Sequence, residues 1–406
     1  MVPSSSLVPD DPSVLLTTAG MQQFKKYYTG EADAVKDFGA KSTASAQKSF
    51  RTSDIESVGD ESHLTFFEML GNFSFGGYFK KEAIKMAYEV IFKELKLPVE
   101  DAVFTVFEGN GLVPEDEDKE SIEIWKGLGI LENQIKKCGK EDNFWGPTGE
   151  EGPCGPTTEI HIRGVEVWNL VFNEYYQDKD KKLTPLEQKG VDTGMGLERL
   201  AMAVQEKKNV FETDLFEPIL EEIPDSDEKS RRIIADHIKG AVFLISEGIL
   251  PSNVERGYVL RRVLRRAMRY GKLLNLSENF LIPIVKKVIE FYGDVYPELK
   301  SKENEILTVI QKEEEKFGKT LGEGLKQFND FVLRRKPKNG KVGVAFDQLI
   351  LYGREAFYLY QTFGFPKEIM QELCQEKNIK FDENGFEEEM KKHQEISRAG
   401  AEKKFV

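Results

Sequence analysis

The chain has 406 residues and a formal net charge of −13, with 40% hydrophobic and 31% charged residues. This composition is typical of a globular protein with two or three domains, and no apolar run approaches the about 18 to 20 residues that cross a bilayer. Three cysteines and four unclustered histidines argue against a disulfide framework and against structural zinc. Together with the lack of a membrane-length apolar run, this predicts a cytoplasmic protein without a membrane partner.

Residues 47–76 are predicted to form two strands joined by a polar loop over 52–61. The strand period of two places His63, Thr65 and Phe67 on one face of the second strand. Arg51, at the end of the first strand, offers a fork of donors for a phosphate, and Phe67 offers a flat surface for a purine ring. A core hairpin with one exposed arginine is the alternative interpretation.

Residues 165–176 form a predicted strand, in which Asn169, Val171 and Asn173 share one face. Residues 191–199 are then predicted to form a strand, a glycine turn and the start of a helix. Asp192 is a natural partner for an ammonium group.

The helix that begins near residue 197 is predicted to turn Glu198 and Arg199 away from its buried stripe. Its N-terminus and Arg199 both favour an anion. A glycine-rich loop with an Asp-initiated turn is the alternative for this segment. The predicted stripe consists of Leu197, Leu200, Ala201 and Val204.

A proline within the acidic run 221–228 predicts a domain boundary. Before it, short strands, turns and a few helices indicate an α+β domain on an antiparallel sheet, residues 1–222. After it, helical periodicity dominates, which predicts a mostly helical domain over residues 229–406. Within that domain, residues 334–344 are expected to form an exposed basic connection.

Residues 256–269 contain six arginines and no acid, in a helix that Ser252 and Glu255 are predicted to start as a capping box. The acidic net charge argues against a nucleic-acid partner, but this local stripe favours one. A solvated charged face is the usual alternative. Five of the arginines form two adjoining rows at i, i+4 spacing and are expected to bind phosphates: Arg261, Arg265 and Arg269 in one row, Arg262 and Arg266 in the other.

The sequence resembles the class II aminoacyl-tRNA synthetases. FFEMLGNFSFG and VDTGMGLER are similar to motifs 2 and 3 of the alanyl branch, and further similar runs are NFW, GPCGP, WNLVF, IADH, PSN and RGYVLRRVLRRAMR. The resemblance implies a class II antiparallel sheet with flanking helices, followed by a helical domain that recognises the tRNA acceptor stem. It also implies that ATP and Mg2+ serve to activate alanine, which is then transferred to the 3′ end of tRNA(Ala).

By the same resemblance, Arg51 and Arg199 are the catalytic residues that hold the phosphates. The implied ATP site consists of Arg51, His63, Phe67, Glu198 and Arg199. The implied alanine site consists of Trp145, Asn169, Val171, Asp192 and Gly194. The implied tRNA site consists of Asn253, Arg256, Arg261, Arg262, Arg265, Arg266, Arg269 and Gln361. The magnesium ligands stay open, with Glu174 and Glu198 as candidates, and so does the oligomeric state.

Several positions depart from the family pattern. The sequence begins at the Val-Pro-Ser-Ser-Ser segment, which a helix precedes in the family, and it stops near Val406, about where the family continues into an editing domain and a C-terminal module. Ser62 stands where an arginine is common, and the motif 2 loop is short. Gln361 replaces an aspartate that, together with an asparagine at the position of Asn253, reads the G·U pair of the alanine acceptor stem in the family.

Two other interpretations remain. A paralogue could activate an amino acid for a non-tRNA acceptor such as a carrier protein, but it would have no need of the arginine-rich helix. A noncatalytic RNA-binding relative would have no need of Arg51, Asp192 and Arg199.

Overall fold

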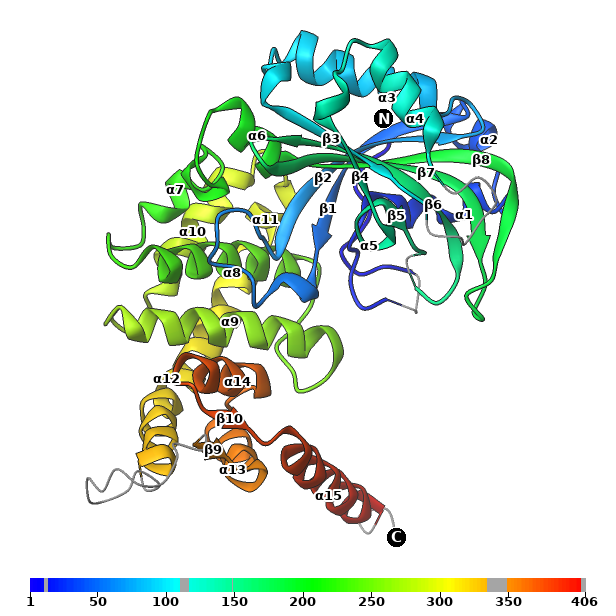
Figure 1. The fold of residues 1–406 in the computed structure, drawn as a ribbon. Helices are drawn as coiled ribbons and strands as arrows, with labels where there is room; N and C mark the ends of the chain where they lie inside the picture. The colour runs from blue at the N-terminus through cyan, green and yellow to red at the C-terminus, as the bar shows by residue number, and fades with distance from the viewer. Residues whose placement is uncertain (11–13, 110–116, 148, 334–348, 403–406) are drawn as a thin grey trace, which may run out of the picture.

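The computed structural model describes residues 1–10, 14–109, 117–147, 149–333 and 349–402. Its main feature is an eight-stranded sheet in the order β1-β2-β8-β7-β6-β3-β4, with β5 paired to β6 (Figure 1). Every neighbouring pair is antiparallel except β3 and β4. The strands are β1 (Ser42–Phe50), β2 (Phe66–Phe75), β3 (Ala102–Phe107), β4 (Ile135–Cys138), β5 (Phe144–Trp145), β6 (Gly152–Ile162), β7 (Val165–Gln177) and β8 (Leu183–Gly196). The predicted antiparallel sheet is confirmed.

One face of this sheet is covered by α3 (Lys80–Tyr88) and α4 (Lys119–Gly127). Alternate residues of β6 and β7, among them Ile160 and Leu170, pack there against Trp125. The start of the chain lies against the other face, where Phe24 packs against Phe73 with ring centroids 4.5 Å apart. The remaining short helices of this part are α1 (Lys25–Tyr28), α2 (Ala34–Phe38), α5 (Lys140–Asn143), α6 (Leu197–Val204) and α7 (Glu217–Leu220).

Helices dominate the chain after residue 222, as the sequence predicts. They are α8 (Glu228–Ser246), α9 (Glu255–Leu273), α10 (Leu281–Tyr292), α11 (Pro297–Ser301), α12 (Glu303–Leu333), α13 (Gly353–Phe363), α14 (Lys367–Glu376) and α15 (Glu383–Glu402). A parallel pair, β9 (Ile350–Leu351) and β10 (Lys380–Phe381), lies among them. The basic segment 334–344 lies outside the described residues. Among the described helices, none is long and apolar enough to cross a membrane.

Helix α8 joins the two parts of the chain. It is buried on all sides from Ile233 to Ser246, because it packs between the β1–β2 edge of the sheet and helices α9 and α10. Phe243 on α8 stacks on Phe66 of β2 at 4.0 Å between ring centroids. Gly240 lets the helix approach the sheet, because a Cβ there would lie 3.0 Å from the Phe50 ring. The sheet and the helices therefore share one apolar core.

Three local predictions are wrong. Strand β2 begins at Phe66, so His63 and Thr65 precede it, because the Thr65 N–H donates to Asp236 (2.9 Å) instead of to a neighbouring strand. Strand β8 runs into α6 without an intervening turn. The cap residue of α9 is Val254, which makes no side-chain cap bond, so Ser252 and Glu255 form no capping box.

Helix α6 also buries a different stripe from the predicted one. Val204 is 42% exposed, whereas Glu198 is only 1% exposed and packs inward with Leu200. The reason is a buried ion pair between Glu198 and Lys239 of α8, 2.8 Å long. Apolar periodicity alone does not reveal a charged residue whose partner lies on another helix.

Candidate functional site

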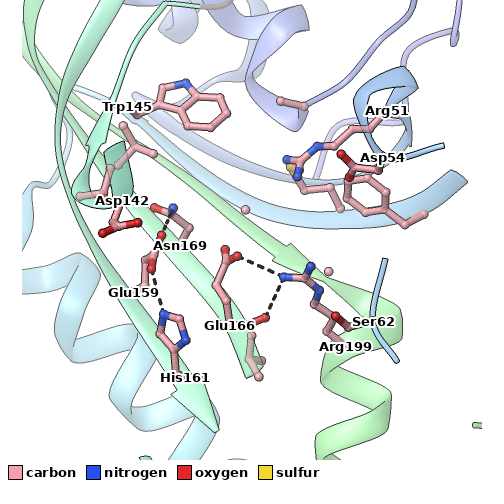
Figure 2. Close-up of a pocket in the computed structure, with 18 of the residues that line it drawn as sticks. Arg51, Asp54, Ser62, Asp142, Trp145, Glu159, His161, Glu166, Asn169 and Arg199 are labelled. Carbon is pink, nitrogen blue, oxygen red and sulfur yellow. Dashed lines mark hydrogen bonds and ion pairs between the residues drawn. The ribbon is translucent and has the colours of Figure 1, made fainter. Parts of the chain in front are cut away.

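A cavity of ≈ 460 Å³ lies on the face of the sheet opposite α3 and α4. Alternate residues of β6, β7 and β8 line it, and the residues between them pack into the core on the other face. Figure 2 shows Trp145 and Asn169 on one side of the cavity and Arg51 and Arg199 on the other. The period of two predicted for 165–176 therefore places Asn169 and Val171 in the lining, while Asn173 is buried and outside it.

Strand register builds the floor of the first side. Val171 pairs with Asp192, and Asn169 pairs with Gly194, so these four residues form two adjacent rows. The side chain of Met69 from β2 lies over Gly194, where a Cβ would approach its sulfur to 3.0 Å. Glycine at 194 thus leaves room for Met69, whose side chain covers this row.

Asp192 is the acid of this floor and is 6% exposed. Burial raises the pKa of its carboxyl group to about 7, because desolvation disfavours the charged form. The described residues place no basic side chain beside it. A ligand that brings a positive charge would therefore find an unpaired buried acceptor.

A polar network continues the floor toward β6. Asn169 donates to Glu159 (2.8 Å), which also accepts from Thr105 (3.1 Å) and contacts the His161 ring nitrogen Nε2 (2.9 Å) (Figure 2). Among the described residues, the Asn169 Oδ1 and the Trp145 indole N–H are buried without a hydrogen-bond partner. Both atoms remain available to a polar ligand.

The opposite side of the cavity carries two arginines. The Arg51 guanidinium lies over the Phe67 ring, 5.0 Å from its centroid, and Asp54 lines the cavity close by. Arg199 donates to the Glu166 carboxylate (3.1 Å) and to its backbone carbonyl (3.3 Å) (Figure 2). Burial lowers the pKa of Arg51, and the nearby charge of Arg199 lowers it further. Two guanidinium groups so close together favour an anion between them.

Two of the residues assigned to ATP, His63 and Glu198, offer no free side chain to the cavity. His63 is not in the lining, and its Nδ1 contacts the Asp60 carboxylate at 2.5 Å, whereas its neighbour Ser62 does line the cavity. Glu198 lines the cavity, but its carboxylate is engaged by Lys239 (2.8 Å) and by the Glu68 N–H (3.2 Å).

This arrangement bears on the magnesium candidates. Glu198 is neutralised by its lysine, and Glu174 is paired with Lys80 (2.9 Å) and Lys189 (2.6 Å) outside the cavity lining. Neither carboxylate fits a cation ligand. In the described part of the chain, no group of three or more metal-ligating side chains is present.

The arginines of α9 divide into two sets. The predicted phosphate-binding face is wrong for Arg265, Arg266 and Arg269, which are at most 6% exposed. Arg265 pairs with Glu313 of α12, and Arg266 and Arg269 both pair with Glu372 of α14 (2.8 and 3.0 Å). Acids from distant helices, rather than from the same helix, neutralise them.

The remaining tRNA candidates differ in exposure: Asn253 is exposed, whereas Arg256, Arg261 and Arg262 are partly buried. Arg261 donates to Asn253 and also pairs with Glu313 (3.4 Å), and the Arg256 side chain donates to the carbonyl of Leu15 (2.5 Å). Arg262 pairs with Glu56 of the loop after β1. Gln361 is exposed on α13. The end of that helix is held against α9, because Arg265 donates to the carbonyl of Gly364.

Sequence reasoning missed several lining residues, among them Met69, Glu159, His161 and Glu166. The signal for two of them is present in β6, where Thr157, Glu159 and His161 alternate with Thr158, Ile160 and Ile162. Glu166 lies at the start of β7, and its position in the lining becomes evident only from its ion pair with Arg199.

The comparisons with known proteins agree on one family. The model described as tRNA synthetases class II (A) matches residues 1–164 and 162–406. The alanine–tRNA ligase of Dehalococcoides mccartyi strain BAV1 is 44% identical over 98% of this chain and 46% of its own length. The enzyme of Petrotoga mobilis is 42% identical over 99% of this chain and 47% of its own length. The enzyme of Thermotoga maritima is 44% identical over 98% of this chain and 47% of its own length. The chain spans about half the length of these curated relatives.

Proposed function

The chain belongs to the family described as tRNA synthetases class II (A), and on this premise we propose that it activates alanine with ATP and transfers it to the 3′ end of tRNA(Ala). The observation that carries the proposal is the polarity of the cavity. Asp192, a buried carboxyl group that pairs with no cation among the described residues, lies on one side, and two arginines, Arg51 and Arg199, lie on the other. An aminoacyl-adenylate has the complementary charges, an ammonium at one end and phosphate at the other.

The residues around Asp192 support alanine as the amino acid. Val171 and Gly194 lie beside Asp192, and Met69 covers Gly194, so a methyl group fits where a longer side chain would collide. Asn169 and Trp145 offer polar atoms to the substrate. Rejection of smaller substrates is weaker, because one missing methyl group changes binding by only about 1 to 3 kcal/mol.

The first step needs positioning more than proton transfer. The alanine carboxylate attacks the α-phosphate, the bond from this phosphorus to the bridging oxygen breaks, and pyrophosphate leaves. A carboxylate is ionised at neutral pH, so no general base is required. Arg51 would hold the α-phosphate and Arg199 the distal phosphates, while Phe67 supports the adenine. Magnesium that accompanies ATP would be held largely by phosphate oxygens and water.

The second step transfers the alanyl group to a ribose hydroxyl of the terminal adenosine. We assign residues 1–222 to the catalytic domain and residues 229–406 to the acceptor-stem domain. The exposed Asn253 and Gln361, with Arg256, Arg261 and Arg262 nearby on α9, supply the tRNA contacts in this proposal. Arg265, Arg266 and Arg269 are left out because they are buried.

Amino-acid-dependent exchange of pyrophosphate into ATP, measured for all twenty amino acids, tests the first step. Alanine is expected to give the highest kcat/KM, with glycine and serine measurable. Charging of an acceptor-stem hairpin tests the second step. No exchange with alanine would overturn the proposal, and exchange without charging would favour a non-tRNA acceptor.

A further inference from the structure

Arg266 is a buried arginine that contacts the loop bearing part of the active site. It is 2% exposed on α9, and its Nη1 donates to the carbonyl of Ile55 at 2.8 Å. Ile55 belongs to residues 52–61, which directly follow Arg51. The same guanidinium pairs with Glu372 of α14 at 2.8 Å, so the charge is neutralised from the opposite side.

The guanidinium also fixes the protonation of a buried histidine. Nη1 of Arg266 lies 2.9 Å from Nε2 of His237 on α8. An arginine can only donate, so Nε2 accepts and the proton resides on Nδ1. That Nδ1 lies 2.8 Å from Asp236 and donates to it. The imidazole is therefore a neutral bridge between Arg266 and Asp236.

Asp236 completes the connection to the active site. Its carboxylate accepts from the Thr65 N–H (2.9 Å) and from the Thr65 hydroxyl (2.6 Å). The Thr65 carbonyl in turn accepts from the backbone N–H of Arg51 at 2.8 Å. His237 and Asp236 are both 0% exposed, so water does not compete for these bonds.

We propose that Arg266 is a positioning residue for amino-acid activation, because it fixes the backbone of Arg51 and of the 52–61 loop that follows it. Through Ile55 it holds the loop directly, and through His237, Asp236 and Thr65 it holds the backbone of Arg51. The proposal rests on the proposed function, in which Arg51 holds the α-phosphate. Arg266 therefore acts in alanine activation, the step before transfer to tRNA, and not in tRNA contact.

Arg269 separates this role from simple stabilisation. It lies one turn further along α9, is 1% exposed and donates to the same Glu372 at 3.0 Å. Its described partners are Glu372 and Glu376 of α14 and the ring of Tyr270, and none of them belongs to the 52–61 loop. A lysine at either position keeps the charge near Glu372. Only Arg266→Lys loses the simultaneous bonds to Ile55 and His237, because an ammonium lacks the planar fork.

The experiment compares the parent, Arg266→Lys and Arg269→Lys in alanine-dependent pyrophosphate exchange without tRNA. For Arg266→Lys, kcat/KM for ATP is expected to fall by about tenfold to a hundredfold, since misplacement of a reacting group by about 1 Å has effects of this size. The KM for alanine should change less than twofold, because Asp192 and its strands are untouched. Arg269→Lys should keep both parameters of the parent, even if its thermal unfolding temperature drops as much.

His237→Asn provides a second route if Arg266→Lys folds poorly. Asparagine can still donate to Asp236 but is too short to accept from Arg266, so kcat/KM for ATP should again fall at constant KM for alanine. Backbone hydrogen exchange in residues 51–61 should rise in both variants and stay unchanged in Arg269→Lys.

The outcomes distinguish the two proposals. An active parent with unchanged ATP kinetics in Arg266→Lys and His237→Asn overturns the positioning role alone. Equal ATP defects in Arg266→Lys and Arg269→Lys also overturn it, because α14 docking would then be the cause. A parent without exchange activity overturns the proposed function, and the role of Arg266 with it.

Discussion

Asp192 is expected to lower the stability of the free protein as the pH rises. Its folded-state pKa is about 7, against an ordinary value of 3.8 that applies to the unfolded chain. Between these values the folded state holds a proton that the unfolded state has lost. Stability from this group is therefore fully present below about pH 4 and is lost as the pH rises to 7.

The magnitude follows from the two pKa values. Their difference is about 3, and each pKa unit corresponds to about 1.4 kcal/mol, so the full effect is on the order of 4 kcal/mol. Between pH 5.5 and 7 the contribution is about 2 kcal/mol. Asp192→Asn removes the titration while keeping the size of the side chain. At pH 8 the variant should be more stable than the parent, and at pH 4 the advantage should vanish.

Urea unfolding of the parent and Asp192→Asn at half-unit steps from pH 4 to 8 measures this difference. A difference in unfolding free energy that is the same at every pH would refute the reasoning, because other titrating groups are common to both proteins. The two proteins must have equal m-values for the comparison to report folded-state burial.

The same carboxyl group links alanine binding to pH. An ammonium beside Asp192 favours its ionised form, so alanine binding below pH 7 must release a proton. The KM for alanine should then rise up to tenfold for each pH unit below 7, while Asp192→Asn binds alanine weakly at every pH. A flat KM from pH 6 to 8 in the parent would show that Asp192 does not face the ammonium.

Three further predictions concern Arg199, Lys239 and Gln361. Arg199→Ala should lower kcat/KM for ATP in pyrophosphate exchange by a factor that corresponds to about 2 to 5 kcal/mol of lost transition-state stabilisation, and it should leave the KM for alanine unchanged. An equal loss for both substrates would contradict the assignment. Lys239→Met should lower the urea-unfolding free energy by about 3 to 5 kcal/mol, because it leaves Glu198 buried without its 2.8 Å partner; adding Glu198→Gln should restore much of this, and a single-variant loss below about 1 kcal/mol would argue against burial of the pair. Gln361→Asp should sharpen the preference for a G·U over a G·C acceptor-stem hairpin, since glutamine both donates and accepts while aspartate only accepts, and undiminished G·U preference in the parent would contradict this.

The sequence by itself determined that the first part of the chain forms an antiparallel sheet, and that one strand presents Asn169 and Val171 on the same face. Strand side chains alternate with a period of two, so this face was predicted before any strand was paired, whereas Gly194 was assigned only by the resemblance. Pairing then set their rows, Val171 opposite Asp192 and Asn169 opposite Gly194. The helical second half was also predicted from the sequence, because apolar spacing is a local property of the chain.

Only the tertiary structure decided what the charged residues do. The arginine-rich helix has no acid at i, i+4, and yet Glu313 lies 48 residues from Arg265 and Glu372 lies 106 residues from Arg266. Glu198 was predicted to face away from the core and is buried because Lys239, 41 residues later, neutralises it. A charge can be buried only with a partner, and such partners come from segments far apart in sequence, which periodicity along one helix does not detect.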